Sequence, residues 1–192
     1  MVNRSRSRSQ KSASKKPGAR PPIAKKRSAT KRAAAPDLPV VASWEDDPGD
    51  PQMLPARTPI EVSAPLQAST PLAFRLRGPA PAPKVYALGT RDFLYYAVAS
   101  ALRRTASFWG GILPSGTRWQ VGSVLAVNVD AGADLNAFYT RGGMEPAGLY
   151  FFHEAVRGRV FNSGESPDIA SHEMGHAILD AIQPDLYDTQ TI

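Results

Sequence analysis

The spacing of apolar residues in the second half of the chain changes from helical to strand-like and back. Over residues 90–106 the apolar positions recur at intervals of three and four, which places them on one face because a helix turns once in about 3.6 residues. Thr90 suits the N-cap of this helix, and Gly110-Gly111 interrupts the chain after it. The stripe that we expect to be buried consists of Leu94, Ala97, Val98, Ala101 and Leu102.

Residues 119–162 have the alternation and the short apolar runs that are typical of β-strands. In residues 119–130, every second position from Val121 onward is largely apolar, which predicts a strand with one buried face. Further strands are expected at 135–139, 148–152 and 159–162, between glycine and proline positions.

Helical spacing returns after Gly164. Ser166 suits an N-cap, Pro167 suits the first helical position, and Pro184 marks the end of the helix. A helix, several strands and a second helix predict an α+β domain with a mixed sheet over residues 84–192. The apolar residues that we expect this second helix to bury are Ile169, Ala177, Ile178 and Ala181.

Composition divides the rest of the chain into two segments. Residues 1–35 contain twelve Lys or Arg and no Asp or Glu, and few apolar residues, which predicts a disordered N-terminal tail. Residues 36–83 contain eleven of the eighteen prolines and are expected to form an extended linker, with a short edge strand near 72–76.

Charge and composition also restrict the partners and the compartment. The basic tail predicts weak contact with nucleic acid or an anionic surface, with a merely solubilising tail as the alternative. The chain has no cysteine, which excludes disulfides and thiolate metal sites. No apolar run approaches the roughly 18 residues of a membrane span, and no secretory signal is seen, so we expect a cytoplasmic protein.

The chemistry of the sequence is concentrated in His172-Glu173-x-x-His176, the HExxH pattern of zinc hydrolases. Residues four apart lie on the same helix face, so the two imidazoles can bind one Zn²⁺. Glu173 is placed to take a proton from a zinc-bound water without ligating the metal. Gly175 costs the helix about 1 kcal/mol relative to Ala, which favours close packing of another segment against it.

Two runs of the sequence resemble the thermolysin-like gluzincin metallopeptidases. Residues 168–180 are similar to the active-site helix of that family, in which an Asp stands before HExxH and another after it. Residues 136–139, Asn-Ala-Phe-Tyr, are similar to the family's edge strand. The resemblance implies a zincin-like fold and binding of a peptide or protein substrate by Asn136 and the backbone of Ala137. It also implies supporting roles for Asp168 and Asp180.

The sequence departs from the family pattern after the HExxH helix. The resemblance implies a third ligand, a glutamate from a later helix, but no glutamate follows Glu173 in this chain. Asp185 and Asp188 are alternatives as the third ligand, and His153 is expected to be a partly exposed strand residue. We therefore expect the third ligand to lie beyond Ile192, and the C-terminal helical half of the fold to be absent from this chain.

These features predict a zinc metallopeptidase, present as a partial chain, in which water attacks the peptide bond with the assistance of Glu173. Two other interpretations remain open. One is an inactive, peptidase-like zinc-binding protein, favoured by the missing ligand. The other is a nucleic-acid-associated protein whose main role resides in the basic tail.

Overall fold

The structure, a computed structural model, describes residues 39–48, 58–64 and 72–188, which fall within one compact unit. The predicted disordered tail over residues 1–35 lies outside the described residues. In chain order the elements are β1 (Val40–Ser43), β2 (Ile60–Ser63), β3 (Phe74–Leu76), α1 (Arg91–Gly110), β4 (Leu125–Asn128), β5 (Ala137–Thr140), β6 (Gly148–Phe151), β7 (His153–Val156), β8 (Arg159–Asn162), the short 3₁₀ helix η1 (Ser163–Glu165), α2 (Pro167–Ile182) and α3 (Asp185–Asp188).

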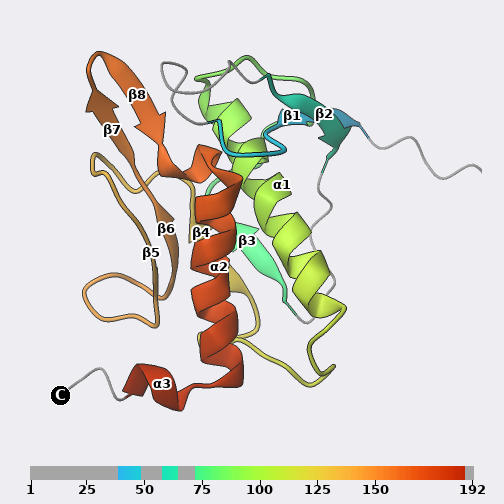
Figure 1. The fold of residues 1–192 in the computed structure, drawn as a ribbon, viewed down its shortest axis with the longest axis vertical. Helices are drawn as coiled ribbons and strands as arrows, with labels where there is room; N and C mark the ends of the chain where they lie inside the picture. The colour runs from blue at the N-terminus through green and yellow to red at the C-terminus, as the bar shows by residue number, and fades with distance from the viewer. Residues whose placement is uncertain (1–38, 49–57, 65–71, 189–192) are drawn as a thin grey trace, which may run out of the picture. The chain divides into compact units, whose positions relative to one another are not determined.

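The central element is a four-stranded mixed sheet with the strand order β3-β4-β6-β5 (Figure 1). Strands β3, β4 and β6 are parallel, and β5 pairs antiparallel with β6 at the edge of the sheet. Two antiparallel pairs, β1-β2 and β7-β8, lie outside this sheet. The α+β class and the mixed sheet that the sequence predicts are therefore confirmed, as is an edge strand at 74–76.

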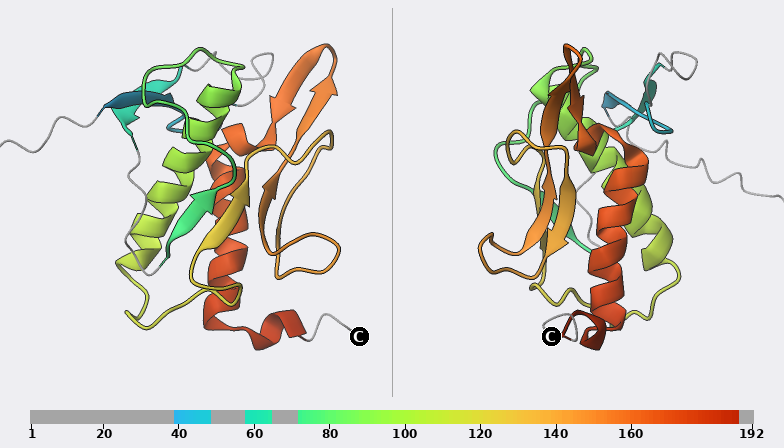
Figure 2. Two further views of the ribbon diagram at one scale, coloured as in Figure 1. Left: turned by 180° about the vertical axis from the view of Figure 1, so that it is seen from behind. Right: turned by 60° about the vertical axis from the view of Figure 1, so that its left-hand side comes forward.

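Helices α1 and α2 pack side by side against one face of this sheet (Figure 2). The hydroxyl groups of Thr105 on α1 and Ser171 on α2 are hydrogen-bonded at 2.8 Å. The layer between helices and sheet is filled with apolar side chains, including Val98, Leu102, Leu125, Leu149, Phe151 and Met174, all fully buried. The HExxH helix is thus supported along its inner face by both the sheet and α1.

Helix α1 follows the prediction closely at its start. The Thr90 hydroxyl accepts a hydrogen bond from the backbone N–H of Phe93 at 3.2 Å, which satisfies one of the free donors of the first turn. The helix continues to Gly110, beyond the predicted end near residue 106. All five residues of the predicted stripe are buried.

Strand β4 is much shorter than the predicted strand over residues 119–130. Gly122 has φ +118°, a conformation in which an ordinary side chain would be strained, and the chain turns there instead of extending. The indole N–H of Trp119 donates to the carbonyl of Ala73 at 2.7 Å and fixes this turn beside β3.

The stretch predicted as a linker contributes packed structure as well as β3. Strands β1 and β2 form an antiparallel pair, and Trp44, which follows β1, packs edge-on against Phe93 of α1 with ring centroids 6.0 Å apart. Val41 and Trp44 are buried, so this short apolar run gains enough burial to fold onto α1 despite the surrounding prolines. In the described part of the chain, no helix is both long and apolar enough to cross a bilayer.

Candidate metal centre and substrate cleft

Helix α2, which carries the HExxH residues, begins as the sequence predicts. Ser166 is its N-cap and its hydroxyl accepts from the N–H of Ile169 at 3.1 Å, while Pro167 occupies the first turn. Ala177 and Ile178 are buried and Ala181 is partly buried, as expected. The prediction that Ile169 is buried in the core is wrong, because its side chain is exposed at the surface. Its side chain instead lines a cavity beside the helix.

The two histidines are brought together on the outer face of α2. Their Nε2 atoms lie 3.0 Å apart and their rings are perpendicular, with centroids 4.6 Å apart. Two nitrogen ligands of one tetrahedral zinc, each about 2.0–2.1 Å from the metal, are separated by about 3.3 Å. His172 and His176 therefore fit two positions of a zinc site, each through the same ring nitrogen.

Within the described residues, no third candidate ligand lies beside His172 and His176. No group of three or more His, Cys, Asp or Glu side chains suited to a metal forms within residues 39–48, 58–64 and 72–188. His153 is the first residue of β7, where it is partly exposed as predicted, and its Nδ1 contacts Asp130 Oδ1 at 2.7 Å. Asp185 begins α3, after the end of the HExxH helix.

Glu173, the predicted base, is buried although its two histidine neighbours are more exposed. Burial raises the pKa of its carboxyl group above the ordinary value, and the positive potential of His176 and His172 and a hydrogen bond from the backbone N–H of Tyr139 oppose this effect. A carboxylate whose pKa is raised in this way binds a proton more readily at neutral pH.

Glu173 and the two predicted substrate-binding residues line one cavity of about 430 Å³, here called the Glu173 cavity. Asn136 and Ala137 form one wall, at the start of edge strand β5. The Asn136 side-chain oxygen accepts from the N–H of Ala137 at 2.9 Å. The residues 136, 137 and 173 that the sequence singled out are therefore neighbours in space, and α2 and β5 face each other across this cavity.

The two aspartates with predicted supporting roles differ in their surroundings. Asp168 is exposed in the first turn of α2. Asp180 is completely buried and accepts hydrogen bonds from the Tyr139 hydroxyl at 2.6 Å and from Nε of Arg141 at 2.9 Å. The Arg141 guanidinium also donates to the carbonyl of Pro184. Asp180 thus connects the C-terminal part of α2 to Tyr139 of β5 and to Arg141, which follows that strand.

Several residues of the cleft were missed by the sequence analysis because they come from the proline-rich stretch. Asp47 and Pro48 line the Glu173 cavity, and the Asp47 carboxylate accepts a hydrogen bond from the Ser166 hydroxyl at 2.7 Å. The one local signal was the apolar run at residues 40–44, which is unusual within a proline-rich segment. Tyr139 belongs to the strand that the resemblance singled out, but its role was missed, and so was that of Arg141, because only the pairing with the distant Asp180 shows these roles.

Comparison of the chain with protein-family models, with curated proteins and with solved structures returned no match.

Proposed function

We propose that this chain carries the catalytic helix and substrate strand of a zinc-dependent metallopeptidase. The observation that supports the proposal most strongly is the approach of His172 Nε2 to His176 Nε2, at 3.0 Å, beside a buried carboxylate. The buried carboxylate belongs to Glu173, which lies between the histidines in sequence and lines a cavity with the edge strand. These are the components that hydrolysis of a peptide bond by water needs on the protein side.

His172 and His176 would hold the metal. When bound, zinc would supply a Lewis acid that polarises the peptide carbonyl and acidifies a water molecule. Glu173 takes the proton from the attacking water and delivers it to the leaving amine, a role that suits the raised pKa of its buried carboxyl group. Its hydrogen bond with the Tyr139 N–H keeps the carboxylate oriented toward β5.

Strand β5 is the surface along which we propose that the substrate lies. It is the last strand of its sheet, and an extended peptide can add to a sheet edge through backbone hydrogen bonds. The start of this strand, Asn136-Ala137, forms a wall of the Glu173 cavity. A peptide bound there would place a backbone carbonyl near the Glu173 carboxylate.

The alternative function is zinc binding without hydrolysis. It is favoured by the histidine pair standing without a third protein ligand in the described part of the chain. A catalytic zinc is generally held by three protein ligands, so two would hold the metal more weakly.

Hydrolysis of a peptide library by the 192-residue chain, with added Zn²⁺, distinguishes these functions. Glu173→Gln should lower the rate by at least about 100-fold, because the general base is removed while both histidines remain. Glu145→Gln is a matched control, since Glu145 is exposed and outside the cavity, and should leave the rate unchanged. Bound zinc without any hydrolysis would favour the alternative, and equal rates for both variants would refute the role of Glu173.

A further inference from the structure

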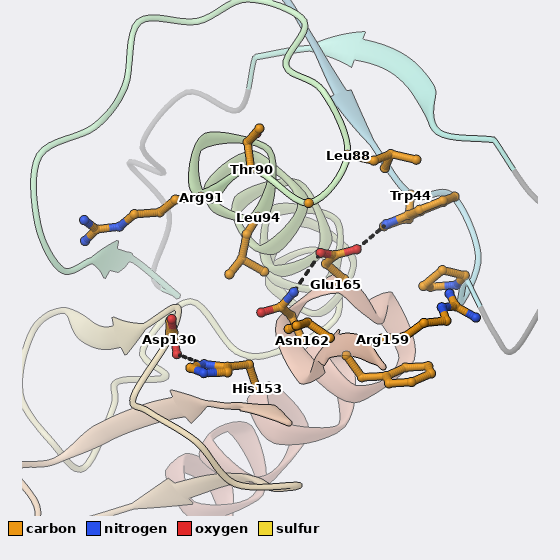
Figure 3. A pocket seen from close by; sticks show the side chains of 14 residues that line it. Trp44, Leu88, Thr90, Arg91, Leu94, Asp130, His153, Arg159, Asn162 and Glu165 are labelled. Carbon is orange, nitrogen blue, oxygen red and sulfur yellow. Dashed lines mark hydrogen bonds and ion pairs between the residues drawn. The ribbon is translucent and has the colours of Figure 1, made fainter. Parts of the chain in front are cut away.

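A second cavity, of about 600 Å³, adjoins the Glu173 cavity and is called the His153 cavity here (Figure 3). The two cavities share Pro48, Phe161 and Asn162 as lining residues. Asn162 ends β8 and pairs with His153 at the start of β7. The base of the β7-β8 hairpin is therefore a common wall, with the site of the proposed chemistry on one side and this second space on the other.

One chain segment also connects the two cavities. Asp130 lines the His153 cavity, and Asn136, six residues later, lines the Glu173 cavity. Backbone hydrogen bonds hold the segment between them against β7: the N–H of His153 donates to the carbonyl of Gly132 at 3.0 Å, and the N–H of Asp134 donates to the carbonyl of His153 at 2.8 Å. Because six residues span at most about 20 Å, the side chain of a peptide residue within about six positions of the Asn136 contact can reach Asp130.

Asp130 presents an oriented carboxylate with one free oxygen to this cavity. Its Oδ1 contacts His153 Nδ1 at 2.7 Å and accepts a hydrogen bond from the N–H of Gly132 at 3.2 Å, so the protein fixes the direction of the carboxylate. Its Oδ2 is turned away from the imidazole in Figure 3 and accepts no hydrogen bond from any residue that the structure describes. Such an oxygen can accept a charge-assisted hydrogen bond from an ammonium or guanidinium group.

Glu165, the second carboxylate on the cavity wall, already has a donor for each oxygen. One oxygen accepts from the indole N–H of Trp44 at 3.3 Å, and the other accepts from the side-chain amide of Asn162 at 3.0 Å. Burial raises the pKa of Glu165, which disfavours its charged form. Glu165 therefore contributes to the polar wall, and Asp130 provides the free acceptor.

The two arginines that line the cavity leave the position beside Asp130 open. Arg91 extends away from the cavity in Figure 3, and its Nη2 lies 3.8 Å from the position that a Cβ atom of Gly78 would occupy. The Arg159 guanidinium lies 5.0 Å from the ring centroid of Phe161, on the opposite side of the cavity from Asp130 in Figure 3. Within the described residues, neither arginine is paired with Asp130. A cation from a ligand therefore meets no competing arginine at this carboxylate.

We propose that the His153 cavity is a subsite of the peptide cleft that takes a basic side chain of the bound peptide, with its charged end held by the Asp130 carboxylate. The inference rests on the proposed peptide binding at β5. Lysine and arginine have long apolar stems that pack along apolar surface while the charged end reaches a polar partner. Leu94 and Phe161 line the cavity and offer such a surface to the stem. A neutral side chain of similar length would fill the same space without the charged contact to Asp130.

Fluorescence polarisation with matched labelled peptides tests this subsite without requiring turnover. The Glu173→Gln chain is titrated into peptides that differ at one position, Lys, Gln or Glu, and this position is moved over about six places. At one place the Lys peptide should bind about fivefold more tightly than its Gln counterpart, which is the magnitude of a partly exposed ion pair. Asp130→Asn, which preserves the size of the side chain, should reduce that ratio to within about twofold without weakening the Gln peptide. Asp130→Lys should make the Glu peptide the tightest of the three.

Glu145→Gln is the matched control, because Glu145 is an exposed carboxylate that lines neither cavity, and it should keep the full preference. Thermal unfolding of each variant checks that the fold is intact. Equal binding of the Lys and Gln peptides at every place, or a preference for Lys that survives in Asp130→Asn, would overturn the basic subsite alone. If no peptide binds at all, the proposed peptide cleft fails together with the subsite.

Discussion

The hydroxyl group of Tyr139 donates a 2.6 Å hydrogen bond to the carboxylate of Asp180, and this contact joins β5 to α2. Asp180 is fully buried and its oxygens also accept from the guanidinium of Arg141. Because β5 provides the candidate substrate strand and α2 the candidate metal helix, this one carboxylate fixes the spacing between them. The backbone N–H of Tyr139 contacts Glu173, so its hydroxyl group and its backbone N–H both contact residues of α2.

Asp180→Asn should destabilise the protein by about 3 kcal/mol, because an amide cannot replace the charge that compensates the partly buried Arg141. Asp168→Asn is the matched control on the same helix. Asp168 is exposed in the first turn, so its substitution should cost no more than about 1 kcal/mol. Urea unfolding measures both changes, and equal losses for the two variants would contradict the role given to Asp180.

Two glycines, Gly164 just before α2 and Gly175 within it, should respond oppositely to alanine. A Cβ atom at Gly164 would lie 2.7 Å from Val98 Cγ2 and 3.4 Å from Phe151, so Gly164→Ala should destabilise by about 1–3 kcal/mol. Around Gly175 a Cβ atom would meet nothing within 4 Å in the described structure, so the prediction that another segment packs closely against Gly175 is wrong for the described residues. Gly175→Ala should therefore stabilise α2 by up to about 1 kcal/mol. The melting temperatures of the two variants and of the unsubstituted chain test both expectations. A loss of stability in Gly175→Ala would show that this position has contacts beyond those described.

The partly buried carboxyl group of Glu165 should make stability fall as pH rises. Burial raises its pKa in the folded protein, and hydrogen bonds from Trp44 and Asn162 offset only part of that effect. The folded state then holds this proton more tightly than the unfolded state, so the stabilisation is complete at low pH and is lost as pH rises through the folded-state pKa.

Unfolding free energies at about pH 5 and about pH 8 test this linkage. The decrease between the two pH values should be smaller in Glu165→Gln than in the unsubstituted chain. Glu145→Gln, which changes an exposed carboxylate, should preserve the full decrease. An identical pH dependence in Glu165→Gln would mean that this carboxyl group is not shielded in the folded protein.

The sequence predicted correctly several features that depend on residues close together in the chain. The Thr90 and Ser166 caps, the buried face of α1 and the strand at 159–162 depend on neighbouring residues, and all are found in the structure. The strand predicted over residues 119–130 was found only at Leu125–Asn128, because apolar alternation continues through Gly122, whose positive φ turns the chain.

The composition of the candidate site could be predicted only in part. The HExxH spacing is itself helical, so the approach of His172 to His176 follows from sequence. The Asp180 cluster and the Asp47 contact with Ser166 join residues far apart in the chain, and no local pattern encodes such pairings. Ile169 has core-like spacing but is exposed at the rim of the cavity, since periodicity cannot distinguish an apolar core from an apolar cleft.

The most direct test of the central proposal is the zinc content of the purified chain after equilibration with Zn²⁺ and removal of free metal. The unsubstituted chain should retain about one zinc, and His172→Gln or His176→Gln should lose it because each removes one of the paired ligands. His153→Gln is the matched control, since His153 lies on β7 beside Asp130, and should retain the metal. Zinc content that is unchanged in both HExxH variants, or lost only in His153→Gln, would contradict the assignment.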